Sequence, residues 1–155
     1  MANIRVQQED FDAGIETTAL RKGNAKIGAI ASFVGLVRDI NDNTGNASLT
    51  LEHYPGMTEK ALATIVAEAE SRWALLGCTV IHRVGTLKPT DQIVLVIVAS
   101  SHRGHAFEAC EFIMDYLKTD APFWKKEVTS EGERWVDSRE SDAAAASRWK
   151  EKSAL

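Results

Sequence analysis

The segment at residues 93–99, Ile-Val-Leu-Val-Ile-Val-Ala, most constrains the fold, because its apolar residues follow one another without a polar interruption. A strand with one solvent-facing side would alternate apolar and polar residues. β-Branched side chains favour a strand over a helix. This continuous run therefore predicts a central strand that is covered on both faces. The run is far too short to cross a bilayer.

Further strands are expected around this central one. Residues 26–37 form a long apolar stretch, in which Gly35 is expected to mark a bulge or a close backbone approach. Residues 49–53 alternate in polarity and are expected to pair back on the strand at residues 26–37. Shorter strands are predicted at residues 4–6, 79–84, 123–129 and 134–136, with a turn at residues 88–91.

Helical periodicity predicts helices at residues 11–22, at 58–76 capped by Thr58 with Gly77 after its end, at 102–119, and from Ser141. Ser100 and Ser101 are N-cap candidates for the third helix. Strands in both hairpin and β-α-β order indicate an α+β class with a mixed sheet, in one domain over residues 1–155 whose tail from about residue 150 is frayed. The buried stripe of the third helix is expected to comprise Phe107, Cys110, Ile113, Met114 and Leu117.

Charge and cysteine content exclude several classes of protein. The net charge of −4 gives no support for nucleic-acid binding. Cys78 and Cys110 form no CxxC pair, and no histidine stands at metal-ligand spacing, so we expect reduced thiols and neither a metal nor a bound cofactor. The N-terminus lacks the apolar core of a signal peptide and no segment is long enough to span a membrane. The expected location is the cytoplasm.

The stretch at residues 117–127 interleaves three lysines with a proline and two aromatic residues. A lysine beside apolar surface loses hydration, so its pKa falls and it can act as a base near neutral pH. Neighbouring strand residues face opposite sides, and we therefore expect Lys125 to share a pocket with Lys118, while Lys126 contributes backbone or surface charge. Read alone, the segment fits a helix end and an edge strand with solvated lysines equally well.

A second candidate anion site lies at residues 100–105, Ser-Ser-His-Arg-Gly-His, where the central strand gives way to a helix. Free backbone N–H groups and the helix dipole favour an anion there. Arg103 supplies a bidentate phosphate partner and His102 a hydrogen-bond donor. Cations at a helix start oppose the dipole, which favours a bound anion over a serine cap with a surface Arg and His.

Arg38 is a third candidate, because it stands where an apolar strand enters the polar loop at residues 39–47. An ion pair with Asp39 or Asp42 explains this arginine equally well. Three further residues are expected to support the site: Phe33 and Met114 as core or pocket wall, and Arg139 as a supporting or cross-subunit group.

His102 and Lys118 fall on one predicted helix, sixteen residues apart. At 1.5 Å per residue, roughly 24 Å separates them, and one small anion cannot reach both ends of a straight helix. In a two-fold dimer with this helix antiparallel to its copy, the start of one helix lies beside the end of the other. We therefore expect a composite pocket, with Arg38, Lys118 and Lys125 from one subunit and His102 and Arg103 from its mate.

Several motifs closely resemble the large, catalytic subunit family of molybdopterin synthase. They are LEHYPGMTEK at residues 51–60, FIMDYLKT at 112–119 and APFWK at 121–125, supported by VIHRVG at 80–85 and RWV at 134–136. The resemblance runs from about residue 27 to residue 149. Motifs of this length are far more specific than a lone glycine pattern.

The resemblance implies a sulfur transferase of molybdenum cofactor biosynthesis with an α/β-hammerhead-like fold and an added small β subdomain. Such enzymes convert cyclic pyranopterin monophosphate (precursor Z) to molybdopterin with thiocarboxylate sulfur from the C-terminal Gly-Gly tail of a small ubiquitin-like subunit. They form a heterotetramer around a homodimer of the large subunit. Leu36 departs from the lysine expected there and should contribute backbone only. The resemblance implies catalytic roles for Lys118 and Lys125, and substrate binding by Leu36, Val37, Arg38, His102, Arg103, Lys118, Lys125, Lys126 and Glu127.

Two other functions fit the same residues. A non-catalytic anion- or nucleotide-binding dimer would use the lysines as ligand clamps, and a Lys→Arg change would then preserve most of the affinity. A scaffold for a ubiquitin-like partner would bind the partner's tail at a sheet edge without pterin chemistry.

Overall fold

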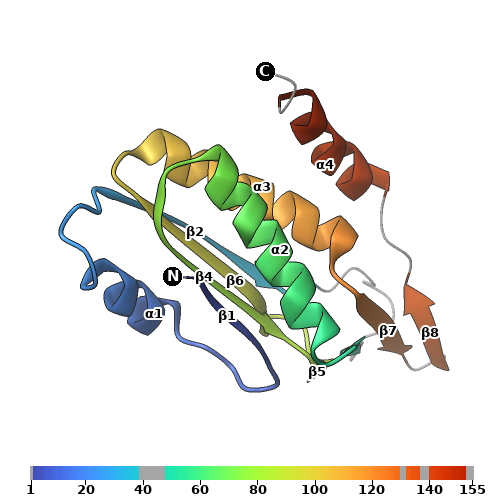
Figure 1. Ribbon diagram of the computed structural model, residues 1–155. Coiled ribbons are helices and arrows are strands. Elements are labelled where there is room, and N and C mark those ends of the chain that lie inside the picture. The colour runs from blue at the N-terminus through green and yellow to red at the C-terminus, as the bar shows by residue number, and fades with distance from the viewer. Residues whose placement is uncertain (1, 39–47, 130–131, 137–139, 153–155) are drawn as a thin grey trace.

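The computed structural model describes residues 2–38, 48–129, 132–136 and 140–152, and its elements are shown in Figure 1. The loop predicted at residues 39–47, the candidate Arg139 and residues 153–155 of the expected frayed tail lie outside the described residues. In chain order the elements are β1 (Ala2–Gln7), α1 (Ala13–Arg21), β2 (Ala29–Leu36), β3 (Ser48–His53), α2 (Met57–Arg72), β4 (Leu75–Arg83), β5 (Gly85–Leu87), β6 (Gln92–Ser100), α3 (Arg103–Asp120), β7 (Phe123–Thr129), β8 (Gly132–Val136) and α4 (Glu140–Lys152).

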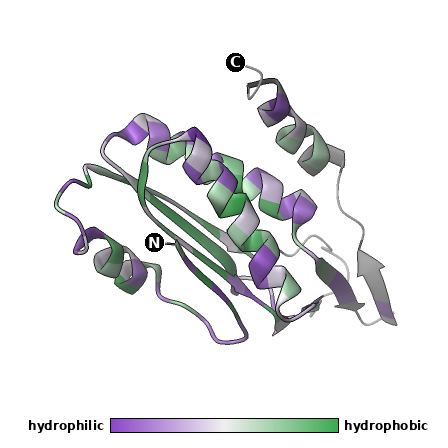
Figure 2. Ribbon diagram, viewed as in Figure 1, coloured by the Kyte–Doolittle hydropathy of each residue, from purple (hydrophilic) through white to green (hydrophobic). Residues whose placement is uncertain are grey.

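The larger sheet has the strand order β1-β4-β6-β2, and it confirms the predicted central strand. Strand β6 pairs antiparallel with both β4 and β2, while β1 joins β4 in parallel, so the sheet is mixed as expected. Alternate residues of β6 enter two separate cores. Val96 packs beneath α2 and α3, whereas Leu95 and Ile97 pack beneath α1 on the opposite face (Figure 1). Figure 2 shows these strands as the apolar layer between helices with polar outer faces.

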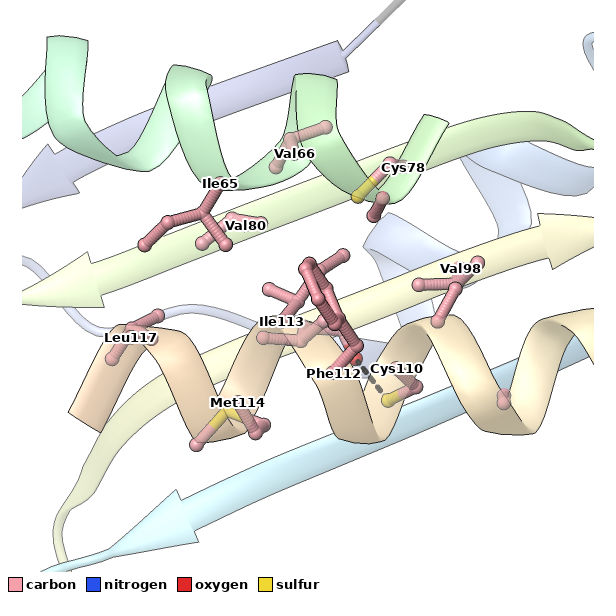
Figure 3. Packing of buried hydrophobic residues seen from close by; sticks show 14 of the residues in the cluster. Ile65, Val66, Cys78, Val80, Val98, Cys110, Phe112, Ile113, Met114 and Leu117 are labelled. Carbon is pink, nitrogen blue, oxygen red and sulfur yellow. Dashed lines mark hydrogen bonds between the residues drawn. The ribbon is translucent and has the colours of Figure 1, made fainter. Parts of the chain in front are cut away.

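The main core lies between α3 and the sheet. Four of the residues predicted for the buried stripe of α3 are buried, and Figure 3 shows Cys110, Ile113, Met114 and Leu117 along the helix that lies over the strands of the sheet. The prediction is wrong for Phe107, whose side chain is 65% exposed. Spacing alone placed it on this stripe, but the buried face at this turn is occupied by the small Ala106 and Ala109.

The smaller sheet is antiparallel and has the order β5-β3-β7-β8. The prediction that residues 49–53 pair with residues 26–37 is wrong, because β3 pairs with β5 and β7 instead. Alternation identified the strand, but it does not encode the partner. The apolar face of β3 buries Leu51 in a separate small core with Val37, Val84 and Leu87. This sheet corresponds to the added β subdomain that the family resemblance implies.

Several element boundaries differ from those predicted. Helix α2 begins after Gly56 and ends at Arg72, with Thr58 buried inside its first turn. Gly77 lies within β4, at a register shift, because the apolar residues after the helix already pair with β6. Ser100 ends β6 and donates its hydroxyl to the Ala74 carbonyl (2.8 Å), so it does not cap α3.

The predicted irregularity at Gly35 is confirmed. The pairing of β2 with β6 shifts register between Gly35 and Leu36. A Cβ atom at Gly35 would lie 2.7 Å from Cγ1 of its cross-strand partner Val94, so a side chain at this position would force a neighbour to shift.

A stacked pair of rings joins the two sheets. His82, near the end of β4, lies face to face with Phe123, the first residue of β7, with ring centroids 3.8 Å apart and an angle of 18° between the planes. His82 is only 5% exposed. Burial lowers the pKa of His82 from 6.5 to about 4. The hydrogen bond to the Arg83 backbone acts against this shift, and the charges of Lys125 and Lys118 act in the same direction as burial.

This burial predicts a specific loss of stability in acid. Between pH 6.5 and 4 the unfolded chain binds a proton at His82, whereas the folded ring stays neutral, so falling pH favours unfolding. His82→Phe keeps an aromatic ring and removes the titration. From pH 7 to pH 4 the wild-type chain should lose about 3 kcal/mol more unfolding free energy than His82→Phe, measured by urea denaturation. Parallel losses in the two proteins would contradict this assignment.

Candidate anion site at the junction of the two sheets

Lys118 and Lys125 come from different elements and lie within electrostatic reach of the same buried ring. Lys118 lies in the last turn of α3 and Lys125 lies on β7. Both ammonium charges act on the neutral His82. The structure therefore brings together the two lysines that the sequence paired, at the junction where α3 ends and β7 begins.

The two lysines differ in exposure. Lys125 is half-buried, as expected for a lysine beside apolar surface, but the side chain of Lys118 is exposed. The expected desolvation of Lys118 is therefore wrong for a single chain: the neighbouring Leu117 is buried in the main core, but Lys118 falls outside the buried stripe of α3.

Strand alternation places the side chains of Lys126 and Glu127, the next two residues of β7, on opposite faces of the strand. Lys126 faces away from Lys125, and its Nζ lies 2.9 Å from Oε2 of Glu133 on β8. The hydrogen bond and charge of Glu133 raise the pKa of Lys126. Glu127 shares the face of Lys125 and is only 6% exposed. A buried carboxylate beside Lys125 can orient that ammonium group or accept a hydrogen bond from a ligand.

Arg38 lies at the same end of the larger sheet. Its neighbour Val37 is buried in the small core to which Phe123 also contributes. The Val37 N–H donates to the Asp91 carbonyl (2.9 Å), and the Val37 carbonyl accepts from Thr90 (2.8 Å). These bonds fix the backbone just before Arg38. The side chain of Arg38 itself is exposed.

Met114, Phe33 and Leu36, which were expected to line or support the site, differ in how exposed their side chains are. Met114 is 7% exposed beneath α3 and is a core residue. On β2, Phe33 is 41% and Leu36 is 55% exposed, so both face solvent in a single chain.

His102 and Arg103 lie at the opposite end of the molecule. His102 is the N-cap residue of α3 without a side-chain capping bond, and both side chains are exposed. They follow Ser100, which is in register with Ala29, whereas Arg38 follows the Leu36 end of the same strand pair. The helix that separates His102 from Lys118 keeps them roughly 24 Å apart. A single chain thus carries the candidate anion ligands in two separate groups.

Histidine 82 was not among the predicted site residues, although a signal for it exists. Cys78 and Val80 enter the core from the same face of β4, and strand alternation continues this face to position 82. A histidine in such a register must be buried and must find a polar partner. Its Nδ1 lies 2.8 Å from the Arg83 carbonyl, which only accepts, so Nδ1 carries the proton and Nε2 the lone pair.

His53 completes the aromatic surroundings of Phe123. It is the cross-strand partner of Phe123, with ring centroids 6.4 Å apart. Because the Thr58 hydroxyl donates to the Tyr54 carbonyl, Nδ1 of His53 donates to Thr58 Oγ1 (3.1 Å). Phe123 therefore has two histidine rings as neighbours, His82 stacked on it and His53 tilted at a greater distance.

Neither cysteine resembles a sulfur carrier. Cys78 and Cys110 are free, buried thiols. Burial raises the pKa of Cys78 to about 12 and the pKa of Cys110 to about 11, so both remain protonated near neutral pH. Within the described residues no group of three His, Cys, Asp or Glu side chains is placed to hold a metal ion. None of the helices in those same ranges is long and apolar enough to cross a membrane.

Comparison with known proteins relates this arrangement to one family. The family described as MoaE protein matches residues 6–120. A curated relative from Ralstonia nicotianae, named molybdopterin synthase catalytic subunit, is 65% identical over 149 residues, which are 96% of this chain and 85% of the relative. The structure of the molybdopterin biosynthesis MoaE protein from Burkholderia ambifaria superposes with a TM-score of 0.84 at 59% identity, covering 97% of this chain and 99% of that one.

A more distant structure shares the fold. It is described as a protein–protein complex of subunits 1 and 2 of molybdopterin-converting factor from Helicobacter pylori, and one of its chains gives a TM-score of 0.72 at 20% identity, covering 88% of this chain and 91% of that one. Because the family match takes in most of the sequence and the near relatives align over almost its whole length, the chain belongs to the MoaE protein family.

Proposed function

We propose that this chain is the catalytic subunit of a molybdopterin synthase. It converts cyclic pyranopterin monophosphate to molybdopterin, with sulfur from the thiocarboxylate of a small ubiquitin-like subunit. The name of the Ralstonia relative supports this activity. The two free thiols are in keeping with a cytoplasmic, reducing setting.

The proposal is carried by the placement of Lys118 in the last turn of α3 and of Lys125 on β7, the strand that follows, with both charges acting on His82. Two ammonium groups beside a neutral ring form a local positive site on a chain with a net charge of −4. A thiocarboxylate and a cyclic phosphate are both anions and require such a site. Positive charge near the reacting carbon also stabilises an oxyanion that develops there.

The two lysines have separable tasks. Lys118 is exposed in a single chain and is free to meet an incoming thiocarboxylate, as a cation or proton donor. Lys125 is half-buried beside Glu127 and suits stabilisation of the developing oxyanion or the departing carboxylate. The stretch from Leu36 to Arg38, together with residues 125–127, would contact the substrate.

The other anion ligands, His102 and Arg103, would come from a second copy of the chain. Strand β2 is an outer strand of the larger sheet, and it exposes Phe33, Val34 and Leu36 between the two groups of ligands. A two-fold antiparallel contact along this strand covers the apolar side chains. It also sets the Arg38 end of one copy beside the Arg103 end of the other.

The partner subunit would bind this homodimer to give a heterotetramer. The relevant observation is the Helicobacter pylori structure, which is a complex of two different subunits and shares the fold of this chain. The extended tail of the partner would deliver its thiocarboxylate to the lysines at the junction of the sheets.

The activity is tested by mixing the chain with a thiocarboxylated small subunit and precursor Z, and measuring dithiolene product. Lys118→Ala should lower kcat about a hundredfold, because it removes positive charge from the developing anion. Lys22→Ala is the matched control, since Lys22 is an exposed lysine at the end of α1, on the opposite face of the larger sheet. Equal rates for the wild type and Lys118→Ala would refute the role of this lysine.

Subunit mixing tests the composite pocket. Lys118→Ala and Arg103→Ala should each lose nearly all activity, and after subunit exchange about a quarter of the wild-type activity should return. Half of the dimers are then mixed, and each mixed dimer has one intact site.

A second mixture is the control for this experiment. Lys118→Ala mixed with Arg38→Ala should regain nothing, because both residues belong to the same half of the pocket and every mixed site keeps one defect. Recovery in the control, or no recovery in the first mixture despite verified exchange, would contradict a pocket shared in this way.

Replacement of the cysteines tests the source of sulfur. Cys78→Ala and Cys110→Ala should keep kcat within about twofold of wild type, because protonated, buried thiols do not carry sulfur. Each should lose about 1–2 kcal/mol of stability from the small cavity left behind. Abolished transfer in a folded variant, measured with the same dithiolene assay, would overturn the model of a separate sulfur carrier.

A further inference from the structure

We propose that His82 is a positioning residue for sulfur transfer, because its ring holds Phe123 and thereby fixes the segment that carries both Lys118 and Lys125. The inference rests on the proposed function of the two lysines. It adds the structural element that sets where their ammonium groups stand.

Phe123 is well placed to fix both lysines. It lies five residues after Lys118 and two residues before Lys125. Helix α3 ends at Asp120, and the Phe123 N–H then donates to the Ala121 carbonyl (2.9 Å), which makes the connection into β7 tight. Because Phe123 and Lys125 are two residues apart on a strand, their side chains project from the same face. A displacement of the Phe123 ring would therefore move both lysines.

His82 provides a rigid support for that ring. Its strand lies between two others, and its cross-strand partners are Val6 on β1 and Val94 on β6. The donation from Nδ1 to the Arg83 carbonyl fixes the ring orientation. The ring stacks flat on Phe123 with 18° between the planes. The larger sheet thus holds a segment that otherwise belongs to the smaller sheet.

A neutral ring suits this place better than other side chains that reach as far. A lysine or arginine at position 82 would add a third positive charge beside Lys118 and Lys125. A carboxylate would pair with the lysines and compete with an anionic substrate. The low pKa of His82 means that the ring stays uncharged near neutral pH, and it also makes His82 a poor base.

Two substitutions distinguish the contribution of the His82 ring from that of its nitrogen atoms. His82→Phe keeps a flat ring for stacking and loses the nitrogen atoms, whereas His82→Asn keeps a donor and loses the ring. In the dithiolene assay, His82→Phe should keep kcat within about threefold of wild type, while His82→Asn should lose about tenfold or more in kcat with little change in KM. A loss as large in His82→Phe, or none in folded His82→Asn, would overturn the proposal.

A double-mutant cycle tests the same contact from the other side. Phe123→Leu should reduce kcat about as much as His82→Asn, and the double variant should be no slower than either single variant, because one contact is lost in all three. Additive losses would show that the two rings act separately and would contradict the proposal. Should His82→Asn fail to fold, Phe123→Leu alone and in combination with His82→Phe still decides the question.

Lysine placement can also be measured without turnover. Acetic anhydride labelling, read by mass spectrometry, should change at Lys118 and Lys125 by about threefold or more in His82→Asn, but not in His82→Phe, since amine reactivity follows local environment. Lys22 is the internal reference. If the wild type transfers no sulfur, the proposed function fails while this labelling still tests the positioning. Unchanged labelling at both lysines in His82→Asn would refute the positioning role.

Discussion

The structure depends on a central strand that has no face toward water. From Val94 to Ser100, β6 is buried on both sides, and its backbone is paired with β4 and β2. A strand of this kind must be covered twice, and the chain does so with α2 and α3 on one face and α1 on the other. The burial of apolar area by these two layers is the main favourable term in folding such a domain. The length of β6 also separates the two ends of the sheet at which the candidate ligands lie.

The second sheet is attached at one end of this framework, and the attachment creates the site. Strand β4 brings His82 to the border, and α3 ends there with Lys118. The chain then turns directly into β7 with Phe123 and Lys125. Cations at this border need not be buried in the main core, where their desolvation would be costly. They lie where rigid elements end, which combines defined positions with access to a ligand.

Much of the fold could be predicted from the sequence, because burial leaves a direct record in residue patterns. Continuous apolar residues predicted β6, and a glycine in an apolar strand predicted the irregularity at Gly35. Strand pairing was harder, and the partner of β3 was predicted wrongly, since alternation records which face is buried and not which strand lies beside it. Phe107 was misplaced for a related reason: helical spacing defines a stripe, but the small Ala106 and Ala109 fill the contact.

The candidate site was predictable in part. Lysines among aromatic residues indicated a local anion site, and the structure brings Lys118 and Lys125 to one place. The exposure of Lys118 could not be predicted, because aromatic neighbours in the sequence do not fix which side chains are covered after folding. Strand alternation could have placed His82 in the core, but not beside Lys118 and Lys125. The significance of His82 comes from contact with Phe123, which is distant in sequence and close only after folding.

The division of the anion ligands into two groups has a simple physical origin. Helix α3 begins at the end of the larger sheet where β6 ends, and it runs back along the sheet. Its first and last turns therefore lie at opposite ends of the sheet. Arg103 and Lys118 therefore cannot meet within one chain, whatever their side-chain rotamers. Two-fold symmetry removes this restriction, because it reverses direction along the shared edge and brings unlike ends together. The exposed apolar residues of β2 lie along that edge, so the surface that would exclude water on pairing is also the surface that would join the two groups. Assembly and completion of the site then depend on the same contact.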